Sequence, residues 1–309
     1  MKFLVTGGAG FIGNNIVRLL LKNGHNVDIL DNLQVGRKEN ISDIFDQVDF
    51  FEIDIRDKKK LEKIIKDYDG IFHEAALTSV TESFEKPQLY KDVNIDGTKN
   101  IFEIAEKENI RVVYASSSSI YGNVKQIPIK ENLEKKPMNP YGQTKLDDEI
   151  LVEKFNDLSV IGLRYFNVYG IGQTGSYAGV ITKFLNKINK KEPLIINGSG
   201  NQIRDFIHVK DIAKANIVAM ENKIKRGFFN IGTGISTSIN DLAKIIIELS
   251  NQRLEIIHGT ELEGDIKISQ ADMGFTRKSL NWNYQIDLKE GLLELIKNTI
   301  NVNKTDSYS

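Results

Sequence analysis

The chain begins Met1-Lys2-Phe3-Leu4-Val5-Thr6-Gly7-Gly8-Ala9-Gly10-Phe11-Ile12-Gly13, a short apolar run that breaks into closely spaced glycines. Apolar residues then recur at helical spacing over residues 11–22. This pattern predicts a strand, a glycine turn and a helix. Glycine permits a tight turn and lets backbone amides approach a pyrophosphate at the helix N-terminus, where the helix dipole favours negative charge. We therefore expect a dinucleotide to contact Gly7, Gly10, Phe11, Ile12 and Gly13.

Asp31 is the expected ribose-binding acid. It follows a second apolar run at residues 27–30 and lies about 20 residues after the glycine turn, where dinucleotide-binding folds place such an acid. Its carboxylate can accept hydrogen bonds from both ribose hydroxyls and would repel a 2'-phosphate, which favours NAD over NADP. An ordinary turn aspartate followed by Asn32 is the alternative. With the functional interpretation, Asn32 is expected to contact NAD as well. Asp54 and Ile55, after the third strand, are either adenine contacts or turn residues.

Strand-like and helix-like segments alternate through the first half of the chain. Further strands are expected at 48–53, 70–72, 112–114 and 160–163, and helices at 61–66, 94–107 and 146–155. This alternation predicts an α/β fold with a Rossmann-like, doubly wound parallel sheet. After Tyr165 the alternation weakens, with a helix at 180–187, a strand at 204–208 and a helix at 211–220. We expect an NAD-binding domain at 1–169 that regains parts of 205–235, and a smaller, discontinuous, mixed α/β substrate-binding domain at 170–309.

Composition excludes several classes of function. The 309 residues contain 41 Lys and Arg against 42 Asp and Glu, so no net positive charge favours nucleic acid or an anionic membrane surface. With no cysteine there are no disulfides or thiolate metal sites, and the four scattered histidines lack metal-ligand spacing. No apolar run is long enough for a signal peptide core or a membrane span. We expect a cytoplasmic protein without a metal centre.

Tyr141 and Lys145 form the candidate catalytic pair. They are four residues apart on a segment that becomes helical after Pro140, so their side chains share one helix face. A lysine ammonium there stabilises a tyrosinate, which can then act as a base, and it can also hold the nicotinamide ribose. Such a pair is common by chance. The upstream glycine turn favours the catalytic interpretation.

Ordered motifs over residues 1–295 resemble the extended short-chain dehydrogenase/reductases, and among them the nucleotide-sugar epimerases similar to UDP-glucose 4-epimerase. These motifs are Thr6 to Gly13, Asp31-Asn32, His73-Glu74-Ala75-Ala76, Asn94 with Gly97-Thr98, Ala115 to Gly122, Tyr141 to Lys145, Arg164 to Gly170, Gly198 to Asp211, and Asn230 to Gly234. The resemblance implies that Ser117 completes the catalytic set with Tyr141 and Lys145. It adds Ala75, Ala76, Asn94 and Ser116 to the NAD contacts.

The serine run at 116–119 discriminates among the reactions of this family. Members that eliminate water carry an adjacent Asp and Glu here, and decarboxylases usually carry a Glu, whereas this chain has Ser118 and Ser119. The resemblance therefore favours oxidation of the sugar at C4 to a transient 4-keto sugar and its reduction from the other face. Capping of backbone groups is the alternative role of these serines.

The resemblance also implies a nucleotide-sugar site. Arg204 matches a diphosphate-binding arginine, with an ion pair to Asp205 as the alternative. A second such arginine is replaced by Leu262, which makes another nucleotide more plausible. Ser269 leaves room for an N-acetyl group, so UDP-N-acetylglucosamine and UDP-N-acetylgalactosamine are expected beside UDP-glucose and UDP-galactose. The remaining expected substrate contacts are Ser79, Val80, Ser117, Ser118, Tyr141, Asn167, Val180 and Asp265.

Two other functions are weighed against 4-epimerisation. One is a different oxidoreductase, epimerase or decarboxylase acting on a UDP-, dTDP- or GDP-sugar, and a reductase among these would consume added NADH. The other is a non-catalytic NAD-sensing scaffold, which would commonly lack the tyrosine or the lysine. Helices around residues 89–107 and 146–155 resemble a dimer interface of the family, which predicts a homodimer. Burial of their apolar stripes within one subunit is the alternative.

Overall fold

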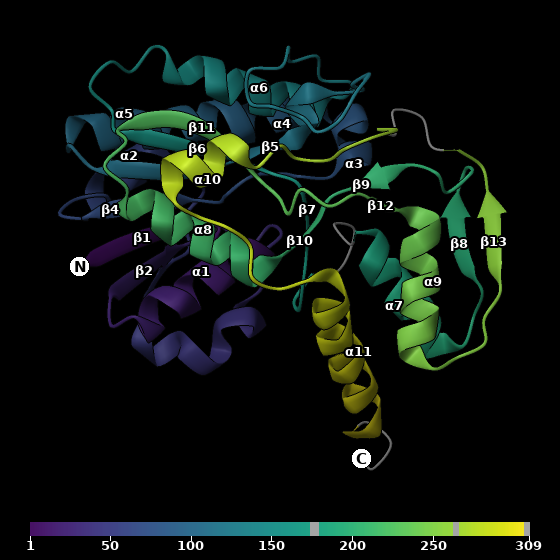
Figure 1. Ribbon diagram of the computed structural model, residues 1–309. Coiled ribbons are helices and arrows are strands. Elements are labelled where there is room, and N and C mark those ends of the chain that lie inside the picture. The colour runs from purple at the N-terminus through teal and green to yellow at the C-terminus, as the bar shows by residue number, and fades with distance from the viewer. Residues whose placement is uncertain (174–178, 262–265, 306–309) are drawn as a thin grey trace.

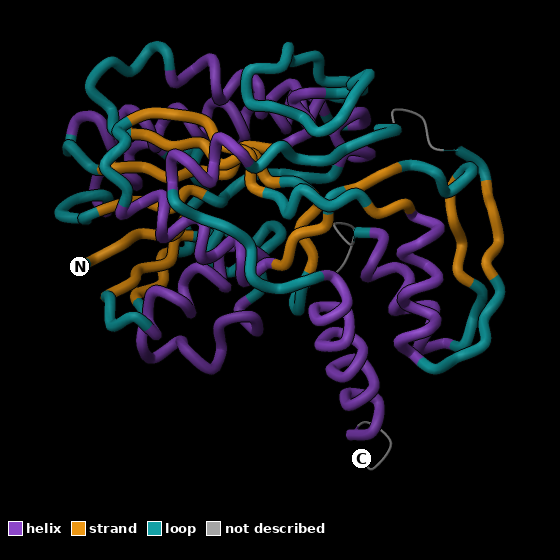
Figure 2. The backbone as a smooth tube through the Cα atoms, in the orientation of Figure 1, coloured by secondary structure: helices purple, strands orange, loops and turns teal. Residues whose placement is uncertain are grey.

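A computed structural model describes residues 1–173, 179–261 and 266–305 of the chain. Its centre is a seven-stranded sheet in which all neighbouring strands are parallel (Figures 1 and 2). Across the sheet the strands are, in order, β11 (Arg226–Ile231), β6 (Val160–Tyr165), β5 (Arg111–Ser117), β4 (Gly70–His73), β1 (Lys2–Thr6), β2 (Asn26–Leu30) and β3 (Asp49–Phe51). The predicted doubly wound parallel sheet is confirmed.

Helices cover both faces of this sheet. One face carries α1 (Phe11–Lys22) and α8 (Val209–Glu221), which pack against each other, together with η1 (Lys38–Gln47) and α10 (Gly274–Leu280). The other face carries α2 (Lys58–Ile64), α5 (Thr98–Lys107) and α6 (Pro140–Val152) (Figure 1). Each face therefore buries its own apolar core, and the strands between them are apolar on both sides, as a parallel sheet requires.

The strand order reverses between β1 and β4. From β1 the chain winds outward through β2 and β3, then crosses back to β4 on the other side of β1 and continues to β5, β6 and β11. In open parallel sheets such a reversal leaves a crevice at the carboxyl ends of the strands, and ligands bind there. The glycine turn after β1 lies at this crevice.

The second part of the molecule packs around a separate apolar core. Its helices are α7 (Val180–Lys190), α9 (Ile239–Ser250) and α11 (Leu288–Thr305), and β8 (Leu194–Asn197) pairs in parallel with β13 (Ile256–Gly259) (Figure 1). Two short sheets connect the parts, β7 (Asn167–Tyr169) with β10 (Phe206–His208) and β9 (Ile203–Arg204) with β12 (Thr237–Ser238). The proposed division at residue 169 stays a prediction, although β11 does lie in the large sheet.

Some predicted elements have different bounds. The single strand expected at 204–208 is two strands, β9 and β10, with different partners. They are separated at Asp205, whose carboxylate accepts hydrogen bonds from the N–H groups of Thr233 at 2.8 Å and Gly234 at 2.9 Å. This carboxylate is fully buried, so the amides of the neighbouring segment satisfy it where the two strands separate.

The helices near the site start earlier than predicted. The helix expected at 94–107 begins at α4 (Pro87–Tyr90), passes through the π-helical η2 (Lys91–Gly97) and ends in α5. The helix expected at 146–155 begins at Pro140, because proline is favoured in a first turn and Asn139 caps it. The short α3 (Val80–Glu85) and η3 (Ser118–Tyr121) complete this region. Within the described residues no helix is long and apolar enough to cross a membrane.

Candidate active site

Two pockets lie at the carboxyl edge of the large sheet and share a wall. The first follows the edge from the glycine turn after β1, past the end of β2, to α6. The second lies between α3, η3, α6 and the segment that follows β6. Both are lined by Ser117, Tyr141, Tyr165, Phe166 and Asn167. A ligand in one pocket would therefore meet a ligand in the other beside Ser117 and Tyr141.

The glycine turn forms a close-packed cradle at one end of the first pocket. Gly7 has a φ of +68°, and a Cβ there would lie 2.8 Å from the backbone nitrogen of Ala75. A Cβ on Gly13 would lie 2.2 Å from the carbonyl oxygen of Gly7. Gly10 caps α1 without any side chain, so the first amides of that helix face the pocket. The turn therefore fits a pyrophosphate, and all five residues expected to contact it line the pocket.

Asp31 presents its carboxylate to the same pocket from the end of β2. Its Oδ1 accepts a hydrogen bond from Leu33 N–H at 2.8 Å, and its Oδ2 accepts one from Ala9 N–H at 3.1 Å. Burial raises the pKa of Asp31, while these two N–H groups oppose that shift. Each oxygen keeps a second lone-pair direction, which suits the two hydroxyls of an adenosine ribose.

The Asp54 carboxylate is bonded within the turn that follows β3, and its expected contact with adenine stays a prediction. Its carboxylate accepts hydrogen bonds from the Arg56 guanidinium at 2.7 and 2.9 Å and from Asn32 Nδ2 at 2.8 Å. The Arg56 contact lowers the pKa of Asp54 to about 2. Asn32 and Ile55 line the pocket and Asp54 does not, because its oxygens are already used by Arg56 and Asn32.

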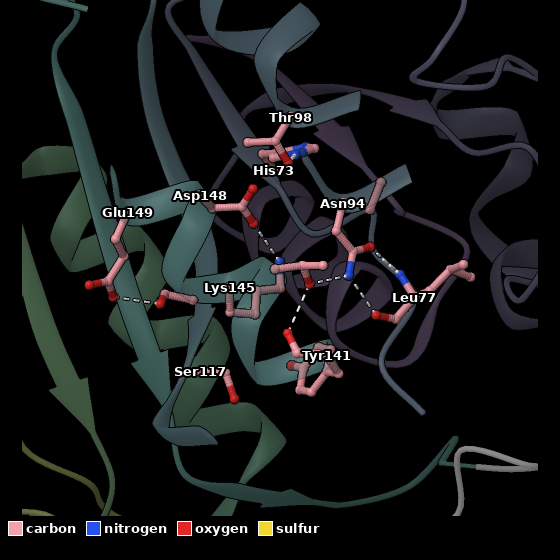
Figure 3. A network of polar contacts seen from close by, with 12 residues as sticks. His73, Leu77, Asn94, Thr98, Ser117, Tyr141, Lys145, Asp148 and Glu149 are labelled. Atoms are coloured by element: carbon pink, nitrogen blue, oxygen red, sulfur yellow. Dashed lines mark hydrogen bonds and ion pairs between the residues drawn. The ribbon is translucent and has the colours of Figure 1, made fainter. Parts of the chain in front are cut away.

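Asn94 was also expected to contact the cofactor, but it lines neither pocket. It is fully buried, and its amide bonds the backbone N–H and carbonyl of Leu77 at 2.8 and 3.0 Å and the Thr144 hydroxyl at 3.0 Å (Figure 3). Leu77 itself lines the first pocket, with Ala75 and Ala76. Asn94 thus ties this pocket wall to α6 and does not reach the cavity.

The serines of the run at 116–119 differ in their hydrogen bonds and in the pocket that each one lines. Ser117 caps η3, accepting hydrogen bonds from Ser119 N–H at 3.2 Å and from the Ser119 hydroxyl at 2.7 Å. Ser116 donates to Glu149 Oε1 at 2.8 Å and also lines the first pocket, while Ser118 lines the second. Ser117 therefore fits both roles considered for it. It caps the N-terminus of η3, and it lies at the wall that the two pockets share, where a substrate could meet its hydroxyl.

Tyr141 and Lys145 both line the first pocket from α6. Asn139 caps this helix through a 2.7 Å hydrogen bond from Gly142 N–H, which fixes the first turn that carries Tyr141. Lys145 is 3% exposed, and its Nζ lies 3.3 Å from Oδ2 of Asp148 one turn further on (Figure 3). Burial raises the pKa of Asp148 to about 7, against the opposing charge of Lys145.

Asp148 was missed in the sequence. Its spacing from Lys145 could have predicted the contact, because residues three apart on a helix share a face. However, Asp147 and Glu149 are adjacent acids, and only the packing of α6 against the sheet shows which of the three faces Lys145. Asp147 instead accepts from Gln143 Nε2 at 2.8 Å on the more exposed side of α6.

His73 and Glu74 lie under the same end of the first pocket. The His73 ring is held between the hydroxyls of Thr6 at 2.7 Å and Thr98 at 3.0 Å. Burial and the charge of Lys145 lower the pKa of His73 to about 3, so the ring is neutral. Glu74 lines the pocket, and burial raises its pKa to about 8.

The second pocket contains most of the predicted substrate contacts, namely Val80, Ser117, Ser118, Tyr141, Asn167, Arg204 and Ser269. Ser79 instead caps α3 by accepting from Glu82 N–H at 3.2 Å, and Val180 starts α7 without lining either pocket. Asp265 and Leu262 lie outside the described residues. Thr81, Phe84 and Glu85 of α3, Asn139 and Ile266 were not predicted but line this pocket.

Arg204 enters the second pocket from β9. Its Nη1 donates to the backbone carbonyls of Ile203 at 2.9 Å and Ile266 at 2.5 Å. The carboxylate of neighbouring Asp205 is occupied by backbone amides, as described above. Across the described residues no group of three His, Cys, Asp or Glu side chains is placed to hold a metal ion.

Comparison with known proteins identifies the family. The model of the NAD dependent epimerase/dehydratase family matches residues 3–232. A putative UDP-glucose 4-epimerase of Methanocaldococcus jannaschii is 42% identical over 98% of this chain and 99% of its own length. A UDP-N-acetyl-alpha-D-glucosaminuronate decarboxylase of Bacillus cytotoxicus is 34% identical over 83% of each chain. The solved UDP-N-acetylglucosamine 4-epimerase of Methanobrevibacter ruminantium is 37% identical, with a TM-score of 0.92 over 97% of this chain and 98% of that one.

Proposed function

Because the chain belongs to the NAD-dependent epimerase/dehydratase family and NAD is its cofactor, we propose that it is a nucleotide-sugar 4-epimerase acting on UDP-hexoses. The observation that carries this proposal is the wall shared by the two pockets. Ser117 and Tyr141 face both the cofactor pocket and the second pocket, so a sugar bound there would place its reacting carbon beside the nicotinamide. The similarity to UDP-sugar 4-epimerases over nearly the whole chain supports the same reaction.

The residues at the shared wall supply the proton chemistry. NAD supplies a ring that can accept a hydride from sugar C4 and return it. Tyr141, as phenolate, takes the proton of the 4-hydroxyl, while the Ser117 hydroxyl holds the reacting oxygen and the Lys145 ammonium balances the negative charge. After the 4-keto sugar has presented its other face, Tyr141 gives the proton back to the oxygen. No proton or hydride is gained or lost in a full cycle, so no added reductant is needed.

The second pocket favours a neutral sugar over a sugar acid. Among the described lining residues of this pocket, Arg204 is the one lysine or arginine, and the proposed diphosphate of the substrate would bind to it. The Glu85 carboxylate lines the same pocket and would repel the carboxylate of a sugar acid. Ser118 and Ser119 also leave the run without the carboxylates that dehydration would use. These features favour epimerisation over the decarboxylation performed by one of the relatives.

Ser269 supports tolerance of an N-acetyl group at C2. It lines the second pocket as a small, buried side chain. The structurally similar UDP-N-acetylglucosamine 4-epimerase is consistent with such tolerance. We therefore propose UDP-N-acetylglucosamine and UDP-N-acetylgalactosamine as substrates together with UDP-glucose and UDP-galactose.

The test is an incubation of the purified protein with a panel of UDP-, dTDP- and GDP-sugars, without added NADH, with products separated by chromatography. C4 epimers of the UDP-hexoses are expected, and Tyr141→Phe should abolish their formation. Tyr284→Phe, which alters a tyrosine that lines neither pocket, serves as the matched control. Release of CO2 from a UDP-uronic acid, or a product that forms only with added NADH, would replace this proposal with a decarboxylase or a reductase.

We also propose that the protein is a homodimer that pairs through α5 and α6. Ile150 of α6 is 53% exposed, which is unusual for a large apolar side chain on a helix that otherwise packs inward. Light scattering should give about twice the chain mass of 34.9 kDa, and Ile150→Asp should lower it toward one chain. A wild-type protein that elutes with the mass of one chain would contradict the dimer.

A further inference from the structure

Glu74 is a carboxylate in the lining of the first pocket that the mechanism above does not use. It follows β4 directly and lines the first pocket together with Tyr141, Lys145 and Tyr165. The residue is half-buried, but its Oε2 atom is enclosed. Its Oε1 accepts a 2.9 Å hydrogen bond from the Tyr165 hydroxyl, which in turn accepts from Asn216 Nδ2 at 2.7 Å.

The Glu74 carboxylate is only partly stabilised by these neighbours. Within the described residues Oε2 has no hydrogen-bond partner. The facing groups are the Tyr165 hydroxyl from β6, Asn216 behind it on α8, Lys145 from α6 and neutral His73 on β4. The Lys145 ammonium already bonds Asp148, so it acts on Glu74 through its charge alone. Burial raises the pKa of Glu74 to about 8, while Tyr165 and Lys145 oppose that shift.

The group that would complete this site is the nicotinamide ring. A hydride must cross to the second pocket at Ser117 and Tyr141, so the ring would lie beside the residues that both pockets share, and Glu74 accepts a hydrogen bond from one of them, Tyr165. The oxidised ring carries a positive charge and the reduced ring carries none. In a site closed to water, a carboxylate therefore interacts more favourably with the oxidised ring.

We propose that Glu74 is a redox-poising residue: its carboxylate stabilises the oxidised nicotinamide relative to the reduced one and so favours return of the hydride to the keto sugar. The effect on cofactor potential rests only on the NAD site, whereas its catalytic use rests on the proposed epimerase function. For an epimerase this bias shortens the life of the keto intermediate, because every hydride taken from the substrate must be returned before product leaves.

The test measures the bound cofactor directly. Holoenzyme is equilibrated anaerobically with mediator dyes of known potential at pH 6 to 9, and the reduced fraction of the bound cofactor is read from its absorbance. At pH 9 the Glu74→Gln variant should show a ratio of reduced to oxidised cofactor roughly tenfold above wild type, which corresponds to about 30 mV for a two-electron couple. At pH 6 the difference should nearly vanish, because Glu74 itself is then protonated.

Two further variants separate charge from structure. Tyr165→Phe keeps the Glu74 carboxyl but removes a hydrogen bond that opposes its raised pKa, so the preference for oxidised cofactor should persist but appear only at higher pH than in the wild type. Glu153→Gln makes the same substitution at an exposed residue that ends α6 and should match wild type. The proposal is overturned if Glu74→Gln has the wild-type ratio at pH 9, or if its ratio differs equally at every pH. No sugar is present in this assay, so it tests the effect of Glu74 on the cofactor even if the protein proves not to be an epimerase.

Discussion

Replacing Asp148 by asparagine should make the enzyme lose activity at alkaline pH. Asp148 is fully buried, its Oδ2 lies 3.3 Å from Lys145 Nζ, and Lys145 is itself 3% exposed. At an effective dielectric constant of about 20, unit charges at this separation attract by about 5 kcal/mol. Asparagine keeps the size of the side chain but removes the charge, which leaves a buried ammonium without its counter-ion.

The sign of the pH dependence follows from the raised pKa of Asp148, about 7. Below pH 6 the carboxyl is protonated in the wild type, so wild type and variant carry the same charge and should have similar activity. Above pH 7 only the wild type has a carboxylate beside Lys145, so only the variant leaves the buried ammonium without its counter-ion. Glu74 and the cofactor also act on Lys145, so we expect only a part of the full attraction to be lost. The ratio of variant to wild-type activity should therefore fall as the pH rises through 7, to roughly a tenth at pH 9.

The assay is kcat/KM for epimer formation from pH 5.5 to 9.5, with Asp147→Asn as the matched control. Asp147 is the neighbouring acid, and it bonds Gln143 on the more exposed side of α6. Its variant should follow the wild-type profile. A ratio of Asp148→Asn to wild-type activity that stays constant over the whole pH range would show that Asp148 does not support the charge of Lys145.

Three other substitutions test separate parts of the structure. Gly13→Ala would force a Cβ to within 2.2 Å of the Gly7 carbonyl oxygen, so the NAD released from denatured, purified protein should fall at least about tenfold; an unchanged NAD content would count against the cradle. Glu149→Gln weakens two 2.8 Å hydrogen bonds from the buried Arg164 guanidinium. The free energy of unfolding in denaturant titrations should therefore fall by about 3 to 5 kcal/mol, and a loss below about 1 kcal/mol would contradict this expectation. Ser269→Tyr should reduce turnover of the N-acetyl sugars relative to UDP-glucose by roughly tenfold in competition assays, and equal losses for both would place the C2 selectivity elsewhere.

The elements that could be predicted from the sequence are those whose cause is local. The glycine turn follows from residues that allow a positive φ, as at Gly7, and close backbone approach, as at Gly7 and Gly13. Alternating apolar segments likewise indicated a parallel sheet with helices on both faces. Tyr141 and Lys145 were paired by helical spacing alone, and both line the cofactor pocket.

The residues that escaped prediction depend on contacts between distant parts of the chain. Glu74 meets Tyr165, 91 positions later, and its unusual pKa arises from burial against that partner. The partners of Asn94 and Asp54 likewise became visible only in the structure: the Asn94 amide bonds Leu77 and Thr144, and the Arg56 guanidinium bonds both oxygens of Asp54. Their expected contacts with NAD stay predictions.

The sequence by itself determined the family, the cofactor and the alternation of strands and helices along the chain, because motifs and apolar periodicity are properties of short segments. The order of the strands across the sheet came only from the structure. Only the tertiary structure decided which polar groups face the cavity and which are bonded away from it. The physical reason is burial: in a packed interior the charge state of a carboxylate depends on partners brought together by the sheet. The glycine turn at residues 7–13 can therefore be recognised from the sequence alone, whereas the contacts of Asp148 with Lys145 and of Glu74 with Tyr165 cannot.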